Sequence, residues 1–178
     1  MDDVLKILEK FEGIIGALLG VMLTLIMTEI LKKTGKFIFY VSKNEVVFQK
    51  RKNPLFSDYD TVSDISDSDQ IKINLVLEIF NSSDTPKVLR KGVFSFYENN
   101  SLILSLEPKD NSTARSNGHW TIRDGFINAN VKNKEIITID LSNVLTKEQT
   151  ETVRRCTKVF FEIKDSKNKK YKILLKEF

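Results

Sequence analysis

An uncharged apolar run near the N-terminus constrains this chain more than any other feature. Residues 13–28 read GIIGALLGVMLTLIMT, and the apolar character extends to Phe11 upstream and to Leu31 downstream. At about 1.5 Å of rise per residue, a helix over residues 11–31 is about 30 Å long, the thickness of a bilayer's hydrocarbon core. Glu12 and Glu29 then lie near the two interfaces, where a carboxylate costs far less than at the bilayer centre. The run predicts a single transmembrane helix.

Two other readings of this run stay open. A cleaved signal peptide has a basic start and a small-residue cleavage site, whereas this segment begins with Asp2 and Asp3 and ends in TEILKKTGK. A helix buried in a soluble fold has a polar face, whereas this run is apolar on all sides for more than four turns. Both readings therefore fit the sequence less well than a membrane span.

The basic residues on either side of the run predict its orientation. Two lysines precede it, and a larger group follows it: Lys6 and Lys10 before, and Lys32, Lys33, Lys36 and Lys43 after. Positive side chains near a span are retained on the cytoplasmic side. The sequence thus predicts a single-pass protein of the cell membrane with a cytoplasmic C-terminal domain. The alternative is an outward-facing envelope or surface protein of the same architecture.

Small residues recur every four positions along the predicted span. Gly16, Gly20, Thr24 and Thr28 form a nearly straight ridge on one side of a helix. Such a ridge lets two backbones approach closely, and threonine hydroxyls can bond across the contact. It predicts self-association as a homodimer. Glycine and threonine are also ordinary residues in membrane helices, so the ridge has an incidental reading too.

The rest of the chain reads as short strands between polar turns. Residues 71–80 (IKINLVLEIF) alternate most clearly, with Val76 and Phe80 on the more polar face, as expected of a central strand. Thr146 and Gln149 form a capping-box pair, which predicts a short helix over residues 147–155. Further strands are expected at residues 37–41, 45–49, 88–97, 102–106, 119–123, 126–131, 135–141, 158–164 and 171–176.

These elements predict a mainly β fold, an immunoglobulin-like antiparallel β-sandwich with one short helix. We expect residues 1–36 to form the anchor and juxtamembrane segment and residues 37–178 to form the sandwich. The stretch IFNSSDTPKVLRKG (79–92), with the anchor before it, resembles short uncharacterised proteins of bacteria and their prophages that carry an N-terminal span and a β-sandwich. The resemblance implies a fold and implies no activity.

The residues that usually carry chemistry are scarce. One histidine (His119) and one cysteine (Cys156) cannot build a multi-ligand zinc site, and no glycine-rich phosphate loop or GxSxG elbow occurs. We expect Cys156 to be a structural thiol and Trp120 to anchor the core or cover its edge. The acidic segment 57–69 is either a solvated loop or a calcium site, although it lacks the EF-hand pattern. The sequence predicts no enzyme, no cofactor and no metal.

The basic residues favour a membrane surface over nucleic acid. The net charge of +4 is low for a nucleic-acid-binding domain. Lys32, Lys33 and Lys36 directly follow the span and are candidates for contact with anionic lipid. Two further groups, residues 50–52 and the lysines of 164–172, join them if those loops share one end of the sandwich. Alternatively, lysines on edges and turns serve to prevent pairing between sheets.

Taken together, the sequence predicts a membrane-anchored, non-enzymatic interaction module. Its expected partners are membrane lipid, a protein, and a second copy of the chain through the helix, with no nucleic acid among them.

Overall fold

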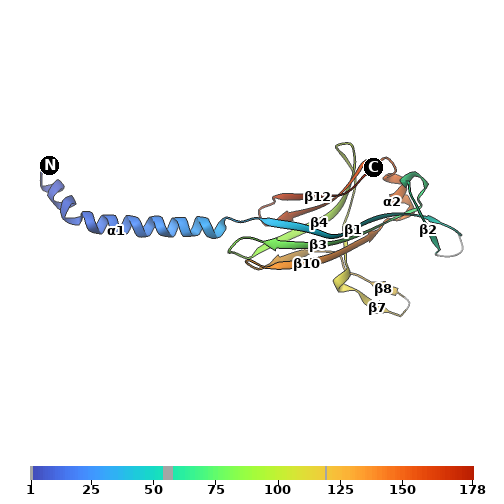
Figure 1. Ribbon diagram of the computed structural model, residues 1–178, viewed down its shortest axis with the longest axis horizontal. Coiled ribbons are helices and arrows are strands. Elements are labelled where there is room, and N and C mark those ends of the chain that lie inside the picture. Colours follow the sequence, from blue (N-terminus) through green and yellow to red (C-terminus); the bar gives the residue numbers. More distant parts are fainter. Residues whose placement is uncertain (1, 54–57, 119) are drawn as a thin grey trace.

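The computed structural model describes residues 2–53, 58–118 and 120–178, with the side chains of 2–10, 12 and 31–33 outside that description. One long N-terminal helix, α1 (Asp2–Lys33), extends from one end of a two-layered β domain and continues its long axis (Figure 1). Within α1, the stretch Gly13–Ile30 has a mean hydropathy of 2.0, and none of it is buried against the protein. The helix is long and apolar enough to cross a membrane.

The first sheet is antiparallel and is built around a central strand. Its order is β2 (Tyr59–Val62), β1 (Phe37–Arg51), β3 (Gln70–Asn81), β10 (Ile136–Val144) and β6 (Lys109–Asp110). Alternate residues of β3 face the core and are fully buried: Ile71, Ile73, Leu75, Leu77 and Ile79. The predicted central strand with one apolar face is therefore confirmed.

The first strand differs from the sequence prediction. Residues 37–41 and 45–49 belong to one strand, β1, which pairs with β3 along its whole length. The register shifts between Val41 and Lys43, so Ser42 is the extra residue of a β-bulge and its hydroxyl bonds to Glu78 at 3.0 Å. The prediction of two strands was wrong because the polar Ser-Lys-Asn segment reads as a turn, whereas a bulge accommodates it within the ladder.

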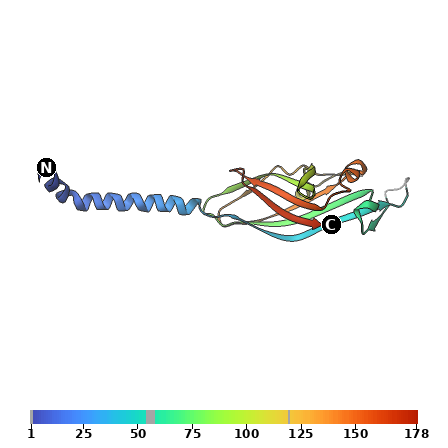
Figure 2. The same ribbon diagram turned by 90° about the horizontal axis from the view of Figure 1, so that it is seen from above.

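The second sheet packs on the first to enclose the core. Its order is β12 (Lys170–Glu177), β11 (Lys158–Asp165), β4 (Lys87–Glu98) and β5 (Ser101–Leu106), and β9 (Asn128–Val131) pairs with the start of β4. Figure 2 shows the domain seen from above, with α1 continuing away from one end. Phe94, Phe96 and Phe161 are the largest fully buried side chains between the sheets. The prediction of a mainly β fold built as an antiparallel two-sheet sandwich is confirmed.

The short helix forms where its capping signal predicts it. In α2 (Lys147–Thr152) the Gln149 amide donates to Thr146 Oγ1 at 3.3 Å, and the Thr146 amide donates to Gln149 Oε1 at 3.0 Å. The helix ends three residues before the expected position. Leu145 and Val153, both fully buried, hold its two ends against the sandwich. Short 3₁₀ turns, η1 (Ile65–Asp67) and η2 (Asn111–Thr113), complete the helical elements of the described residues.

A hairpin projects sideways from the sandwich (Figure 1). It comprises β7 (Arg115–Asn117) and β8 (Trp120–Ile122), and its base is closed by two bonds between Arg115 and Asp124 at 2.9 and 3.0 Å. Trp120 is 76% exposed, so the prediction that it anchors the core was wrong. His119 lies outside the described residues. The excursion carries Trp120 away from the two sheets, where no core is available to bury it.

The two ends of the sandwich differ in position relative to α1. We call the end that receives the helix the proximal end; it comprises segments 34–36, 82–87, 132–135 and 165–170. The opposite, distal end comprises segments 50–53, 58–69, 98–101 and 145–157, and it includes α2 and the chain's C-terminal edge (Figure 1). Because β1 runs from one end to the other with 15 residues, the ends are about 50 Å apart.

Candidate functional site

The predicted small-residue ridge is exposed along α1. A Cβ added to Gly16 or Gly20 would meet no atom within 4 Å. The Thr24 hydroxyl donates to the Gly20 carbonyl at 2.8 Å, and the Thr28 hydroxyl donates to the Thr24 carbonyl at 2.7 Å. Both hydroxyl protons are therefore used in hydrogen bonds within the helix. To a second helix, the two threonines present small side chains whose oxygens can still accept hydrogen bonds.

The junction between helix and sandwich requires a glycine. The Thr34 amide closes the last turn of α1 on the Ile30 carbonyl at 2.9 Å, and Gly35 follows with φ of +125°. A Cβ on Gly35 would lie 2.5 Å from Ser83 Cα, which is shorter than real contacts allow. The positive φ and the close backbone approach both exclude a larger residue, so the chain enters the sandwich in one tight arrangement.

Hydrogen bonds then hold this junction to the loop between β3 and β4. The Lys36 amide donates to Ser82 Oγ at 2.9 Å, and the Lys36 carbonyl accepts from both the Ser82 amide at 3.1 Å and its hydroxyl at 2.9 Å. Lys87 Nζ donates to the Gly35 carbonyl, and Lys134 Nζ donates to the Ser82 carbonyl at 2.7 Å. The linker is thus bonded to the domain at two consecutive residues, Gly35 and Lys36.

Asn81 organises the loop on which the linker rests. Its side-chain amide donates to the carbonyls of Thr85, Val131 and Lys132 at 2.9 to 3.1 Å, and its Oδ1 accepts from the amide and hydroxyl of Ser83. Asn81 and Ser83 are both fully buried. Every buried polar group here has partners, as a stable interior requires. Asn81 therefore ties the β3–β4 loop and the β9–β10 loop of the proximal end into one unit.

The proximal end carries an excess of positive charge. Its segments hold seven lysines against three acidic residues, Asp84, Glu135 and Asp165. The distal end holds six basic and eight acidic residues. Lys36 shares the proximal end with three lysines of the last hairpin, Lys167, Lys169 and Lys170, whereas Lys50, Arg51 and Lys52 lie at the distal end, about 50 Å away. The side chains of Lys32 and Lys33 lie outside the described part of the chain.

A cavity of about 550 Å³ opens among these proximal lysines. It lies between the linker, the start of β4 and the β11–β12 turn, and its charged lining residues are Lys36, Lys87, Asp165, Lys167 and Lys169. Burial lowers the pKa of Lys87, and the nearby charges of Lys167 and Lys169 lower it further. The cavity is therefore a region of positive potential at the end where the helix enters.

The one carboxylate in this cavity already has partners. Asp165 Oδ1 accepts from the amides of Lys167 and Lys169 at 2.8 and 2.9 Å, and Oδ2 accepts from the Tyr171 hydroxyl at 3.3 Å. The Asp165 carboxylate is therefore used in hydrogen bonds that hold the conformation of the β11–β12 turn. Lys169 Nζ lies 5.2 Å from the centre of the Tyr171 ring, a distance at which the ring stabilises a cation.

A buried carboxylate lies midway along the outer face of the second sheet. Glu162 is 4% exposed, and its carboxylate accepts hydrogen bonds from Ser95 Oγ at 3.0 Å and Tyr97 Oη at 2.8 Å. It also forms ion pairs with Lys170 Nζ at 2.7 Å and Lys172 Nζ at 3.4 Å. Desolvation raises the pKa of Glu162, but the bonds from Lys170, Tyr97 and Ser95 outweigh it and hold the pKa below its usual value. This cluster joins three strands and serves the fold.

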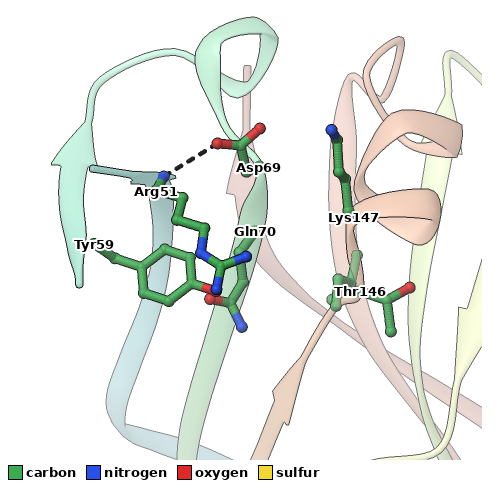
Figure 3. Close-up of a pocket in the computed structure, with 7 residues that line it drawn as sticks. Arg51, Tyr59, Asp69, Gln70, Thr146 and Lys147 are labelled. Atoms are coloured by element: carbon green, nitrogen blue, oxygen red, sulfur yellow. Dashed lines mark hydrogen bonds between the residues drawn. The ribbon is translucent and has the colours of Figure 1, made fainter. Parts of the chain in front are cut away.

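A second cavity, of about 370 Å³, lies at the distal end (Figure 3). Arg51, Tyr59, Asp69 and Gln70 line it from β1 to β3, and Lys147 faces them from α2. Asp69 Oδ2 accepts a hydrogen bond from the Arg51 backbone amide at 3.1 Å. The lining mixes both signs of charge, with Arg51 and Lys147 basic and Asp69 acidic.

The remaining candidate residues for chemistry have structural surroundings. Cys156 is 4% exposed, its thiol lies 3.1 Å from the Lys158 carbonyl, and burial raises its pKa. In the acidic segment, Asp64 caps η1, while Asp58 and Asp60 lie 3.8 and 2.9 Å from Lys52 Nζ. Among the described residues, no group of three or more histidine, cysteine or acidic side chains is arranged to hold a metal ion.

Sequence reasoning missed two residues that matter most at the proximal end. Asn81 reads as part of a polar turn, and Gly35 reads as a residue after a helix. A glycine two residues past the last helical lysine was a usable signal, because that position commonly adopts a positive φ. No local signal marks Asn81 as a hub, since two of its acceptors lie 50 and 51 residues further along the chain.

Comparison with known proteins matches the whole layout. Residues 35–176 match the model of the family described as YopI Ig-like domain. Over 179 aligned residues, covering 100% of both chains, the sequence is 38% identical to the SPbeta prophage-derived uncharacterized protein YopI of Bacillus subtilis (strain 168). The alignment covers the whole of both chains, and the relative is prophage-derived, which agrees with the prophage-type resemblance expected from the sequence.

Solved structures give only distant similarity. One is the Northeast Structural Genomics Consortium target SoR45, with 9% identity, a TM-score of 0.33, and coverage of 80% of this chain and 83% of that one. Another is a Bordetella pertussis protein assigned as ApaA, with 10% identity, a TM-score of 0.33, and coverage of 82% and 93%.

Proposed function

This chain belongs to the YopI Ig-like domain family, and we propose that it is a single-pass membrane protein whose immunoglobulin-like domain is a non-enzymatic binding module in the cytoplasm. The observation that carries the proposal is the stretch Gly13–Ile30, which is apolar and wholly uncovered by the sandwich. A stretch of eighteen predominantly apolar residues without protein cover, whose one charged residue (Glu29) lies next to its end, has its lowest free energy in lipid.

The junction gives such an anchor a second role. Gly35 and the Lys36–Ser82 bonds fix how the sandwich follows the helix. A span that crosses the bilayer then holds the domain with its long axis directed away from the membrane. The distal end is displaced by the length of β1, about 50 Å, which suits a module that presents a binding surface at a distance from the bilayer.

The charge distribution supports the cytoplasmic orientation. Lys32, Lys33 and Lys36 follow the span, and the proximal end adds six more lysines near the same interface. The cytoplasmic leaflet carries the anionic lipids, so this end gains free energy when it faces that leaflet.

Carbonate extraction tests the anchor. We expect the full chain to stay in the membrane pellet at high pH, because a span is held by apolar burial and not by charge. A variant with Leu19→Lys and Leu23→Lys is the matched control, since two central charges raise the cost of insertion by roughly 5 kcal/mol. Release of the unmodified chain into the soluble fraction would show that α1 does not span.

Labelling of a single introduced cysteine tests the orientation. Cys156 is buried, so it is replaced by alanine, and Asn100→Cys supplies an exposed thiol in the β4–β5 turn at the distal end. A membrane-impermeant maleimide should label this thiol only after cell lysis. Labelling in intact cells would instead support the outward-facing envelope protein.

We place the protein-binding surface on the β7–β8 hairpin. Trp120 is 76% exposed and Ile122 42% exposed, on an element that projects from the domain. Exposed tryptophan supplies more binding free energy than most residues when a partner covers it. In-cell crosslinking followed by identification of bound proteins is the test. Trp120→Ala should remove the partner, whereas Leu102→Ala, an exposed residue on the β5 edge, should keep it.

Self-association through the ridge is the second part of the proposal. Gly16→Ile with Gly20→Ile adds bulk where two helices would touch and should abolish crosslinked dimers. Leu18→Ile with Met22→Ile on the opposite face is the control and should leave dimers intact. Dimers that survive the glycine changes would assign the ridge to the ordinary composition of membrane helices.

A further inference from the structure

We propose that the proximal cavity binds the phosphate of an anionic phospholipid from the leaflet that α1 enters. This inference rests on the proposed membrane span and adds to it a specific lipid site. The cavity lies beside Gly35 and Lys36, directly after the helix, and has a volume of about 550 Å³. That is within the range of sites that enclose small ligands.

Distance along the chain places the cavity at the level of lipid headgroups. The apolar stretch ends at Ile30 and α1 ends at Lys33. Three helical residues rise about 5 Å, and the headgroup layer is roughly 5–8 Å thick on each side of the hydrocarbon core. Gly35 and Lys36 therefore lie at the outer boundary of the headgroups, and the cavity that they line opens within reach of a lipid phosphate.

The charges of the cavity fit a phosphate. Four lysines line it, and Asp165, the one acidic residue among them, is committed to the amides of the β11–β12 turn and to Tyr171. Lys87 is half-buried and is held by the Gly35 carbonyl, so one ammonium group is fixed in place before any ligand binds. Lysine ammonium groups bind phosphate as point charges and tolerate several headgroup geometries.

The position of the site distinguishes it from a general basic surface. The lysines come from the linker, from β4 and from the turn between β11 and β12, and the Asn81 network fixes the loop that leads into β4. The hydroxyls of Thr85 and Ser166 also line the cavity and can bond to phosphate or glycerol oxygens. A lipid bound here would hold the domain at a fixed rotation about the helix axis.

Native mass spectrometry of the full chain in detergent micelles tests the site. The micelles contain phosphatidylcholine alone, or phosphatidylcholine and phosphatidylglycerol in equal parts. We expect retained phosphatidylglycerol and little phosphatidylcholine. The variant Lys36→Gln, Lys167→Gln, Lys169→Gln should bind phosphatidylglycerol roughly a hundredfold more weakly, at about fivefold for each charge removed. Lys87 is left unchanged because it also supports the junction.

The control removes the same charge from the distal end, as Lys50→Gln, Lys147→Gln, Arg154→Gln, and should keep the lipid. Equal losses in both variants would overturn the site in favour of net charge alone. Full displacement of lipid by inorganic phosphate at the same concentration would assign the cavity to a free anion. Carbonate extraction of the proximal variant separates this proposal from the anchor, because the variant should lose the lipid and still remain in the membrane pellet.

Discussion

The proximal and distal ends of the sandwich differ in the contacts that their connecting segments make and in their charge. At the proximal end, the buried residues Asn81 and Ser83 bond the β3–β4 loop to the β9–β10 loop. Exposed hydrogen bonds between Lys36 and Ser82 then join the linker to the β3–β4 loop, and lysines surround this junction. At the distal end, α2 and η1 close the core with local caps, and acidic residues outnumber basic ones. The difference indicates that the proximal end is suited to hold the helix and contact a membrane surface, whereas the distal end closes the hydrophobic core.

The strongest test of this comparison is the Asn81 hub. Asn81→Ala should lower the free energy of unfolding by roughly 3–5 kcal/mol, because it removes the side-chain donor of the Val131 and Lys132 carbonyls and the acceptor of the buried Ser83 hydroxyl. The measurement is denaturant unfolding of the purified chain. Asn111→Ala removes an amide that bonds to Asp140 at 2.7 Å on an exposed surface, and it should cost about 1 kcal/mol. Equal costs would mean that Asn81 is an ordinary loop residue.

The junction glycine gives the next largest effect. Gly35→Ala should destabilise the closed junction by about 3 kcal/mol, because it adds strain at a φ of +125° to a clash with Ser83. Hydrogen exchange of the Lys36 and Ser82 amides reports this opening. Gly118→Ala is the matched control, with a φ of +64° and no atom within 4 Å of the added Cβ, and it should cost about 1 kcal/mol. If Lys36 stays protected in Gly35→Ala, the junction is not the rigid element inferred above.

How far the sequence predicts these features depends on whether their causes are local. The alternation of β3 and the capping box before α2 are local, and both predictions held. The continuity of β1 through Ser42 is decided by pairing with β3, more than thirty residues away in sequence, and was missed. The role of Gly35 depends on Ser83, and that of Asn81 on Val131 and Lys132, so neither contact is visible before the chain folds.

The exposure of Trp120 shows that a general burial tendency does not predict the position of a single residue. Tryptophan is buried on average, and an average rule fails where a hairpin leaves the sheets entirely. The sequence signal that was available is the polar character of residues 109–118, which include β7, and of residues 123–125, which leaves Trp120 few apolar neighbours in sequence. The predicted fold was therefore correct in its core and wrong at its most exposed aromatic residue.

Between the two ends, Glu162 offers a test by pH. Its pKa is lowered in the folded chain from the usual 4.5, so its contribution is complete above about pH 4.5 and is lost as the pH falls through the folded pKa. Glu162→Gln should cost about 2 kcal/mol at neutral pH, the value of hydrogen bonds to a charged group. The difference between the two proteins should shrink below pH 4.5. A difference that is independent of pH would mean that the carboxylate charge contributes nothing.

The smallest expected effect lies on the hairpin, and it separates binding from folding. Trp120→Ala should change the free energy of unfolding by less than about 0.5 kcal/mol, because an exposed side chain away from the core contributes little to stability. Phe96→Ala, fully buried in β4, should cost about 4 kcal/mol and serves as the contrast. Thermal unfolding of both variants provides the measurement. Loss of the crosslinked partner in a Trp120→Ala protein of unchanged stability would assign the exposed tryptophan to recognition, since no structural defect would remain to explain the loss.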